Sequence, residues 1–138
     1  MRMVAITRKY IGTPYKLGGK SVSEGLDCIS LILAIGEDLG YDLPYEFGGY
    51  NRDTYPQLYT KEPLKAKKLM VDFLKSICNE INPRLLRPRD LVLLSNPATG
   101  NVVIGMYSGS NLVLTAPESG IDLFNLDLYS IKGVFRYV

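Results

Sequence analysis

Cys28 is the residue whose type and setting best suit catalysis in this chain of 138 residues. It follows Asp27, a residue type that often caps the start of a helix, and it opens the apolar run 28–35. The partial positive charge at a helix N-terminus lowers the pKa of a thiol and favours the nucleophilic thiolate. The preceding loop, 12–25, is rich in glycine, which lets a ligand approach the backbone closely. The pattern indicates a nucleophilic cysteine, against the alternative that Cys28 is a small, inert core residue.

The composition narrows the chemistry that such a thiol can take part in. The chain contains no histidine, which excludes a histidine general base and a zinc site built on histidine. Cys28 and Cys78 are its two cysteines, too few for a disulfide framework or a four-cysteine metal site, so we expect no metal and no cofactor. A disulfide bond between Cys28 and Cys78 is possible, but nothing in the sequence favours it. With 16 basic and 14 acidic side chains the net charge is +2, so we expect no nucleic-acid partner.

Three helices are predicted in the first part of the chain. The central one covers 27–39, begins at the Asp27 cap and is apolar on nearly every side, which is typical of a helix buried on every side. A short helix is expected over 2–11. An amphipathic helix is expected to open at Pro63 and to continue to about residue 77.

Between the second and third helices, residues 41–62 are expected to be irregular. Five of the ten tyrosines fall there, together with two prolines and a Gly48-Gly49 pair. Two interpretations of the tyrosines stay open. They form a contact surface, or they cover the edge of the core beneath a long loop.

From residue 90 onward the hydrophobic residues recur at every second position, and short turns separate the apolar runs. Strands are predicted at 90–95, 102–107, 112–116 and 133–138, which make an antiparallel meander. Helices followed by a meander give an α+β fold, with the central buried helix packed on the sheet and one domain over 1–138. We expect no membrane span and no signal peptide, and therefore synthesis in the cytoplasm, because the longest apolar run is short and charges interrupt the N-terminus.

Several motifs, in order along the chain, resemble those of the NlpC/P60 cell-wall peptidases. The run YIGTPYKLGG from Tyr10, followed by GLDC ending at Cys28, is similar to the family's N-terminal signature. RPRDLV from Arg87 resembles its "PGDL" strand entry, and VIGMY from Val103 its "HVGIY" strand. LTAP from Leu114 is similar to its "HA" strand, and the final GVFR to its last strand.

The resemblance implies a papain-like fold and a set of site residues. It places Cys28 at the nucleophile position, Asp27 at a position that can bind the free amine of a substrate, and Tyr15 in the wall of the substrate groove. Active members cut the stem peptides of bacterial cell walls, so the implied partners are stem peptide or cell-wall proteins. The tyrosine-rich insert and the ending look most like the branch found in phage and prophage tails, which implies phage-tail partners and a virion or tail association.

The sequence departs from the family pattern at the positions that carry the chemistry. Val103 stands where the general-base histidine belongs and Thr115 where the third, imidazole-orienting residue belongs, and their spacing of 12 keeps the family register. Ile29 replaces a hydroxyl residue expected to face the substrate, and Arg89 replaces the glycine of "PGDL". Valine can neither accept nor donate a proton, which a cysteine hydrolase requires.

Three interpretations follow from these residues. The first is an NlpC/P60-like domain without catalysis that binds stem peptide or serves in a phage-tail or cell-wall assembly. The second is an active cysteine hydrolase with a non-standard base, for which Lys16, Lys20 and Tyr107 are the candidates. The third is an α+β domain of another class in which Cys28 is only structural.

Overall fold

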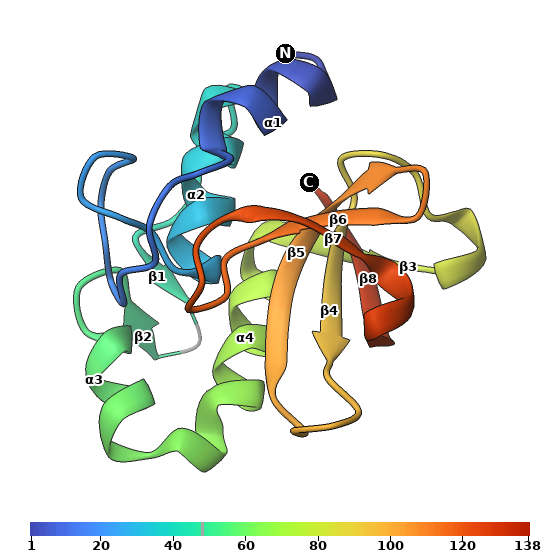
Figure 1. Ribbon diagram of the computed structural model, residues 1–138. Helices are drawn as coiled ribbons and strands as arrows, with labels where there is room; N and C mark the ends of the chain where they lie inside the picture. The colour runs from blue at the N-terminus through green and yellow to red at the C-terminus, as the bar shows by residue number, and fades with distance from the viewer. Residues whose placement is uncertain (48) are drawn as a thin grey trace.

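The computed structural model describes residues 1–47 and 49–138. Figure 1 shows the helices gathered beside the main sheet, which has six strands. Helices α2 (Cys28–Asp38) and α4 (Ala66–Ile77) pack directly on strand β5 (Val102–Gly109). This arrangement confirms the predicted α+β fold, with a central helix against an antiparallel sheet. In the described part of the chain, every helix is too short or too polar to cross a membrane.

The sheet has the strand order β3-β8-β4-β5-β6-β7, and each neighbouring pair is antiparallel. Strands β4 to β7 follow one another as a meander. The last strand, β8, returns to pair with both β4 and β3, so the sheet is wider than the predicted meander. The bounds are β3 Cys78–Ile81, β4 Leu91–Ser95, β5 Val102–Gly109, β6 Leu112–Thr115, β7 Asp122–Asn125 and β8 Ser130–Tyr137.

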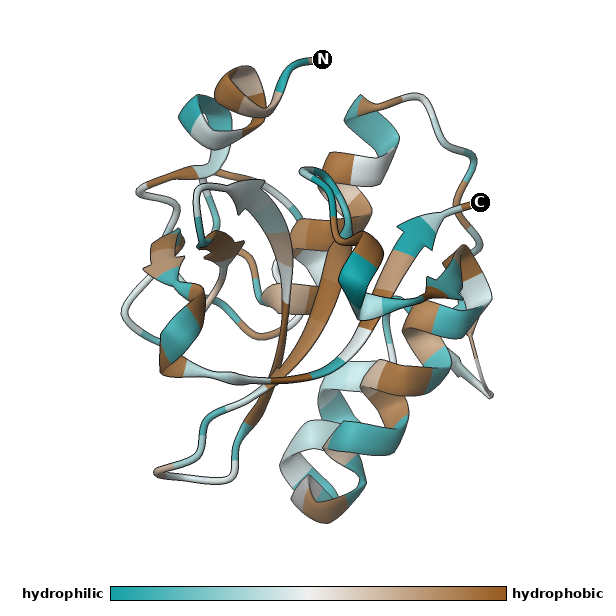
Figure 2. Cartoon of the chain, turned by 90° about the vertical axis from the view of Figure 1, so that its right-hand side faces the viewer, coloured by the Kyte–Doolittle hydropathy of each residue, from teal (hydrophilic) through white to brown (hydrophobic). Residues whose placement is uncertain are grey.

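The two faces of the sheet bury two separate hydrophobic clusters. In β4, Leu91 and Leu93 belong to the main core, which also contains the buried faces of α2 and α4. Their neighbours Val92 and Leu94 belong to a smaller cluster on the opposite face. Because successive side chains of a strand point to opposite faces, a strand buried on both sides is apolar throughout, and Figure 2 shows the central strands as largely hydrophobic.

Helix α2 begins and ends where its sequence predicts. Asp27 is the N-cap, and it forms a capping box with Ser30, in which each side chain bonds the backbone N–H of the other residue. At the other end Gly40 adopts φ +88°, the left-handed conformation that terminates helices. The buried positions include Ile29, Leu31, Ile32 and Ile35, and the helix packs against β5 of the sheet.

The segment 41–62 is more regular than predicted. It contains a short hairpin, β1 (Glu46–Phe47) with β2 (Tyr50–Asn51), and a helix, α3 (Tyr55–Lys61). Gly48, part of the expected irregular segment, lies outside the described residues. Pro56, one of the two prolines that favoured an irregular segment, occupies the first turn of α3. Proline is tolerated there because the backbone N–H groups of the first turn have no partner within the helix.

Other boundaries differ by less. The first helix, α1, covers Met3–Tyr10, and α4 begins at Ala66 because Pro63–Lys65 form a 3-10 turn instead of its first turn. The side chain of Leu64 is consequently exposed and takes no part in the apolar face of α4. The short strands β3 and β7 were not predicted, since four-residue edge strands carry little alternation to detect. Two further 3-10 turns cover Pro83–Leu85 and Leu126–Leu128.

Candidate active site

Asp27 joins three segments at the start of α2. Its Oδ1 accepts hydrogen bonds from the backbone N–H (2.8 Å) and the hydroxyl (3.0 Å) of Ser30. Its Oδ2 accepts from the backbone N–H of Gly18 (2.7 Å) and from the hydroxyl of Tyr55 (2.6 Å). The carboxylate is buried, and four donors fill its acceptor sites. A substrate amine, the ligand expected from sequence, can therefore bind Asp27 only after one of these bonds breaks.

The Cys28 thiol occupies the first turn of α2, as predicted, but its pKa is raised to about 12. Burial is the largest cause, and the negative charge of Asp27 adds to it. Three backbone N–H groups, those of Ile104, Cys28 and Ile29, act in the opposite direction. The expectation that the helix N-terminus lowers the thiol pKa is therefore wrong for this chain, because desolvation outweighs the helix dipole. At neutral pH the thiol is protonated.

The strands opposite Cys28 approach it through their backbone. Besides the Ile104 N–H that faces the thiol, the carbonyl of Ile104 accepts a 2.7 Å hydrogen bond from the hydroxyl of Thr115. Thr115 is fully buried and pairs with Gly105 across β5 and β6, which are antiparallel as expected. Val103, next to Ile104, packs with the smaller cluster on the other face of the sheet. The residue of β5 that contacts the thiol is thus Ile104, through its peptide, and the side chain of Val103 is directed away.

Two tyrosines of α3, Tyr55 and Tyr59, complete the surroundings of Cys28, and neither was among the predicted site residues. Tyr55 is buried and bonds Asp27, as described above. The hydroxyl of Tyr59 lies beside the thiol: burial raises its pKa most, and the charge of Cys28 raises it further. That hydroxyl is buried and, in the described part of the chain, makes no hydrogen bond of regular geometry. The signal in the sequence was the spacing of 55 and 59, which places both side chains on one face of a helix.

The other two predicted positions differ in exposure. Tyr15 is 37% exposed, and burial together with the charges of Asp27 and Cys28 raises its pKa to about 12. It therefore lies at the surface beside the buried pair, as a residue in a groove wall would. Ile29 is fully buried within the main core and presents no surface to a substrate, because the second residue of α2 points toward the sheet.

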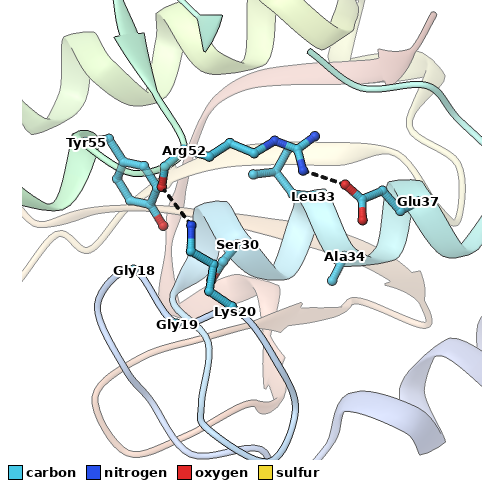
Figure 3. A pocket seen from close by; sticks show the side chains of 9 residues that line it. All are labelled: Gly18, Gly19, Lys20, Ser30, Leu33, Ala34, Glu37, Arg52 and Tyr55. Carbon is cyan, nitrogen blue, oxygen red and sulfur yellow. Dashed lines mark hydrogen bonds and ion pairs between the residues drawn. The ribbon is translucent and has the colours of Figure 1, made fainter. Parts of the chain in front are cut away.

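A small pocket of about 80 Å³ lies along α2, lined on the helix by Ser30, Leu33, Ala34 and Glu37. Figure 3 shows that Arg52 reaches Glu37 across it, while the Lys20 ammonium points to the carbonyl of Arg52. The loop that forms one wall turns tightly at Gly19, where a Cβ would lie 1.8 Å from the carbonyl oxygen of Gly25. Cys28 does not line this pocket. The charged side chains that do line it are paired, Lys20 with Asp53 and Arg52 with Glu37.

The substitute bases considered from sequence are all engaged elsewhere. Lys16 pairs with Glu24 at 2.8 Å, and Lys20 pairs with Asp53 at 2.7 Å. Tyr107 packs with the smaller cluster on the far face of the sheet. The groups that do surround the thiol are phenols, a carboxylate held by four donors and backbone N–H groups.

Comparison with known proteins gives this site its context. The profile of the NlpC/P60 family matches residues 12–133, which include Cys28, α3 and all strands but the end of β8. The chain belongs to the NlpC/P60 family. The buried thiol at the start of α2 therefore lies within an NlpC/P60 domain, and the interpretation as an unrelated α+β fold is excluded.

Relatives of this NlpC/P60 chain include hydrolases and a non-catalytic protein. It is 29% identical over 119 residues to a gamma-DL-glutamyl hydrolase of Bacillus subtilis. The matched region makes up 85% of this chain but only 23% of the length of that hydrolase. The fold matches the NlpC/P60 domain of the peptidoglycan hydrolase SagA with a TM-score of 0.63 and 23% identity, over 97% of this chain and 95% of that one. It matches RipD of Mycobacterium tuberculosis, a non-catalytic NlpC/P60 protein adapted to peptidoglycan binding, with a TM-score of 0.63 and 16% identity, over 99% and 95%.

Proposed function

We propose that this NlpC/P60 domain binds bacterial cell-wall stem peptide without cutting it. The observation that carries the proposal is the protonated Cys28 thiol, whose pKa is raised to about 12, together with the absence of histidine from the chain. Peptide cleavage requires a base to form the thiolate and an acid to protonate the leaving amine. Burial raises the pKa values of the Tyr55 and Tyr59 phenols far above their usual range, so both are protonated near neutral pH and are poor bases.

The degenerate site follows from the family positions in the sequence. By resemblance, Val103 stands at the sequence position of the general-base histidine and Thr115 at that of the third residue. The Val103 side chain, expected to face Cys28, instead packs on the opposite face of the sheet, because successive side chains of β5 alternate between the two faces. The structure gives Thr115 a different task, since its hydroxyl bonds the carbonyl of the Ile104 peptide whose N–H faces the thiol. With valine and threonine at these two positions, the strands offer the thiol a backbone N–H, which favours the thiolate, but no side chain that transfers a proton.

Binding remains possible at the exposed side of the site. Tyr15 offers an accessible phenol next to the buried Asp27–Cys28 pair. RipD, which shares the fold, is a non-catalytic member described as adapted to peptidoglycan binding, so the fold supports that activity without hydrolysis. We further propose that the domain serves in a phage-tail or cell-wall assembly and is virion- or tail-associated, as the tyrosine-rich insert 41–62 implies by resemblance.

Two measurements on one set of samples test the proposal. Purified protein is incubated with muropeptides and the products are read by mass spectrometry, with Cys28→Ser as the control. Sedimentation with insoluble peptidoglycan measures binding, with Tyr15→Ala as the test variant and Tyr45→Ala, another exposed tyrosine, as its control. We expect no cleavage by either protein, binding by the parent and by Tyr45→Ala, and loss of binding by Tyr15→Ala.

The alternative function is hydrolysis of stem peptides with a non-standard base. The Tyr59 hydroxyl beside the thiol is the observation in its favour, since this group lacks another regular hydrogen-bond partner in the described part of the chain. Release of cleaved stem peptide that disappears in Cys28→Ser and in Tyr59→Phe would establish this alternative and overturn the proposal.

A further inference from the structure

A second cleft, of about 430 Å³, lies at the opposite end of α2 from Cys28. Tyr137, which lines the cleft, shows where the cleft lies along α2. Its hydroxyl donates a 2.8 Å hydrogen bond to the carbonyl of Ile32, and its ring lies against Gly36. At 1.5 Å per residue, Gly36 is about 12 Å along the helix axis from Cys28. The cleft is lined mainly by three arginines, one aspartate and two tyrosines: Arg87, Arg89, Arg136, Asp90, Tyr41 and Tyr137.

One of the three arginines is already paired. Arg136 binds Asp90 through two parallel bonds, Nε to Oδ1 at 2.7 Å and a terminal nitrogen to Oδ2 at 2.8 Å. Asp90 is buried and also accepts the backbone N–H of Arg87 at 2.8 Å, so its carboxylate is committed to holding this wall. The pair fixes the orientation of the Arg136 guanidinium at the edge of the cleft.

The other two arginines leave the cleft strongly positive. Arg87 and Arg89 are exposed, and neither guanidinium is paired with a carboxylate in the part of the chain that the structure describes. With Asp90 as the one acidic lining residue among the described side chains, three positive charges and one negative charge give a local balance of +2. A concave surface with this balance attracts anions.

The backbone at Arg89 is a second, independent observation. Arg89 adopts φ +78°, in the left-handed region that favours glycine and disfavours side chains with a Cβ. Its N–H is held by the carbonyl of Tyr107 at 2.8 Å, which fixes this turn at the entry to β4. A long charged side chain at a position suited to glycine indicates that the guanidinium itself is needed there.

The remaining wall is a rigid aromatic platform. The rings of Tyr41 and Tyr137 stack with centroids 4.7 Å apart, and the Tyr137 hydroxyl is tied to α2. A ligand that enters the cleft therefore meets Arg136 and the tyrosine pair already in position, and only the side chains of Arg87 and Arg89 remain to be ordered.

We propose that this cleft binds a ligand through a phosphate group. A dianionic phosphate balances the local charge of +2, whereas one carboxylate leaves a guanidinium uncompensated. The guanidinium fork also matches phosphate oxygens in bidentate geometry. The platform of Tyr41 and Tyr137 supports the part of the ligand beyond the phosphate. The cleft is separate from the thiol, so this inference stands whether or not the proposed stem-peptide binding is correct.

The test is a calorimetric titration at fixed ionic strength with inorganic phosphate, with glycerol 3-phosphate and with a glycerol phosphodiester; acetate is the carboxylate comparison. The main variant is Arg89→Gly, which removes the charge and relieves the backbone, so it folds at least as well as the parent. Arg84→Ala, an exposed arginine on the neighbouring 3-10 turn, is the control.

We expect phosphate binding that weakens by about tenfold or more in Arg89→Gly and is unchanged in Arg84→Ala, as the loss of a charged hydrogen bond predicts. The charge balance predicts tighter binding of the glycerol 3-phosphate monoester than of the singly charged diester, and a diester that binds as tightly would contradict the charge argument. Equal affinities for acetate and phosphate, an unchanged affinity in Arg89→Gly, or no binding of any phosphate probe would each overturn the proposal.

Discussion

Tyr55 and Tyr59 lie one turn apart on the same short helix, and the same change, tyrosine to phenylalanine, should have opposite effects at the two positions. The Tyr55 hydroxyl donates a 2.6 Å bond to the buried carboxylate of Asp27. The Tyr59 hydroxyl is equally removed from water but makes no regular hydrogen bond in the described part of the chain. Each substitution removes one oxygen and leaves the ring in place, so differences in packing are small.

The magnitudes follow from what each oxygen leaves behind. Tyr55→Phe deprives a buried, charged group of one of its four donors, and hydrogen bonds to charged groups contribute about 1.5–3 kcal/mol. Tyr59→Phe removes a buried hydroxyl that has the Cys28 thiol, a weak hydrogen-bond group, beside it, so the variant should be as stable as the parent or more stable by up to about 1 kcal/mol. The two variants should therefore differ by about 1.5–4 kcal/mol in the free energy of unfolding.

Urea denaturation followed by far-UV circular dichroism measures this difference. With a slope of about 2 kcal/mol/M, the midpoint of Tyr55→Phe should fall by about 1 M while that of Tyr59→Phe stays or rises. Equal slopes in the three proteins are the control for an unchanged unfolded state. A loss of stability in Tyr59→Phe as large as that in Tyr55→Phe would refute the assignment of the two hydroxyls.

Three further predictions concern the thiol, the buried ion pair and the loop. Ionisation of Cys28 should lower the free energy of unfolding above pH 9 by up to about 1.4 kcal/mol per pH unit. The reason is that the thiol has its ordinary pKa of 9.0 in the unfolded chain, whereas in the folded chain the pKa is raised to about 12. Cys28→Ser should flatten this slope when urea denaturation is measured as a function of pH. Arg136→Ala should lower the urea midpoint far more than Arg84→Ala, because it leaves the carboxylate of Asp90 buried without its cation; equal midpoints would contradict the pairing. Gly19→Ala should lower the melting temperature and cost about 1–3 kcal/mol, because its Cβ would lie 1.8 Å from a backbone oxygen; an unchanged melting temperature would contradict the loop geometry.

The sequence was sufficient for the elements whose signals are local. The cap at Asp27, the apolar interior of 28–35 and the stop at Gly40 all lie within or beside α2, and each was confirmed. The apolar runs that predicted the central strands are likewise local, and they are continuous because these strands are buried on both faces. The absence of histidine is a property of the chain itself, and no tertiary structure changes it.

Tertiary structure decided what surrounds the thiol. The helix start favours a low pKa for Cys28, but burial raises it to about 12, and burial depends on segments far away in the chain. The tyrosines of α3 reach the site from a segment predicted to be irregular, and Ile104 reaches it from the middle of the sheet. The cleft of Arg89 is also formed by separate segments, at the entry to β4 and in β8. Residue types and local periodicity fix which groups are present, whereas desolvation and charge act through space, so only the folded chain determines how those groups behave.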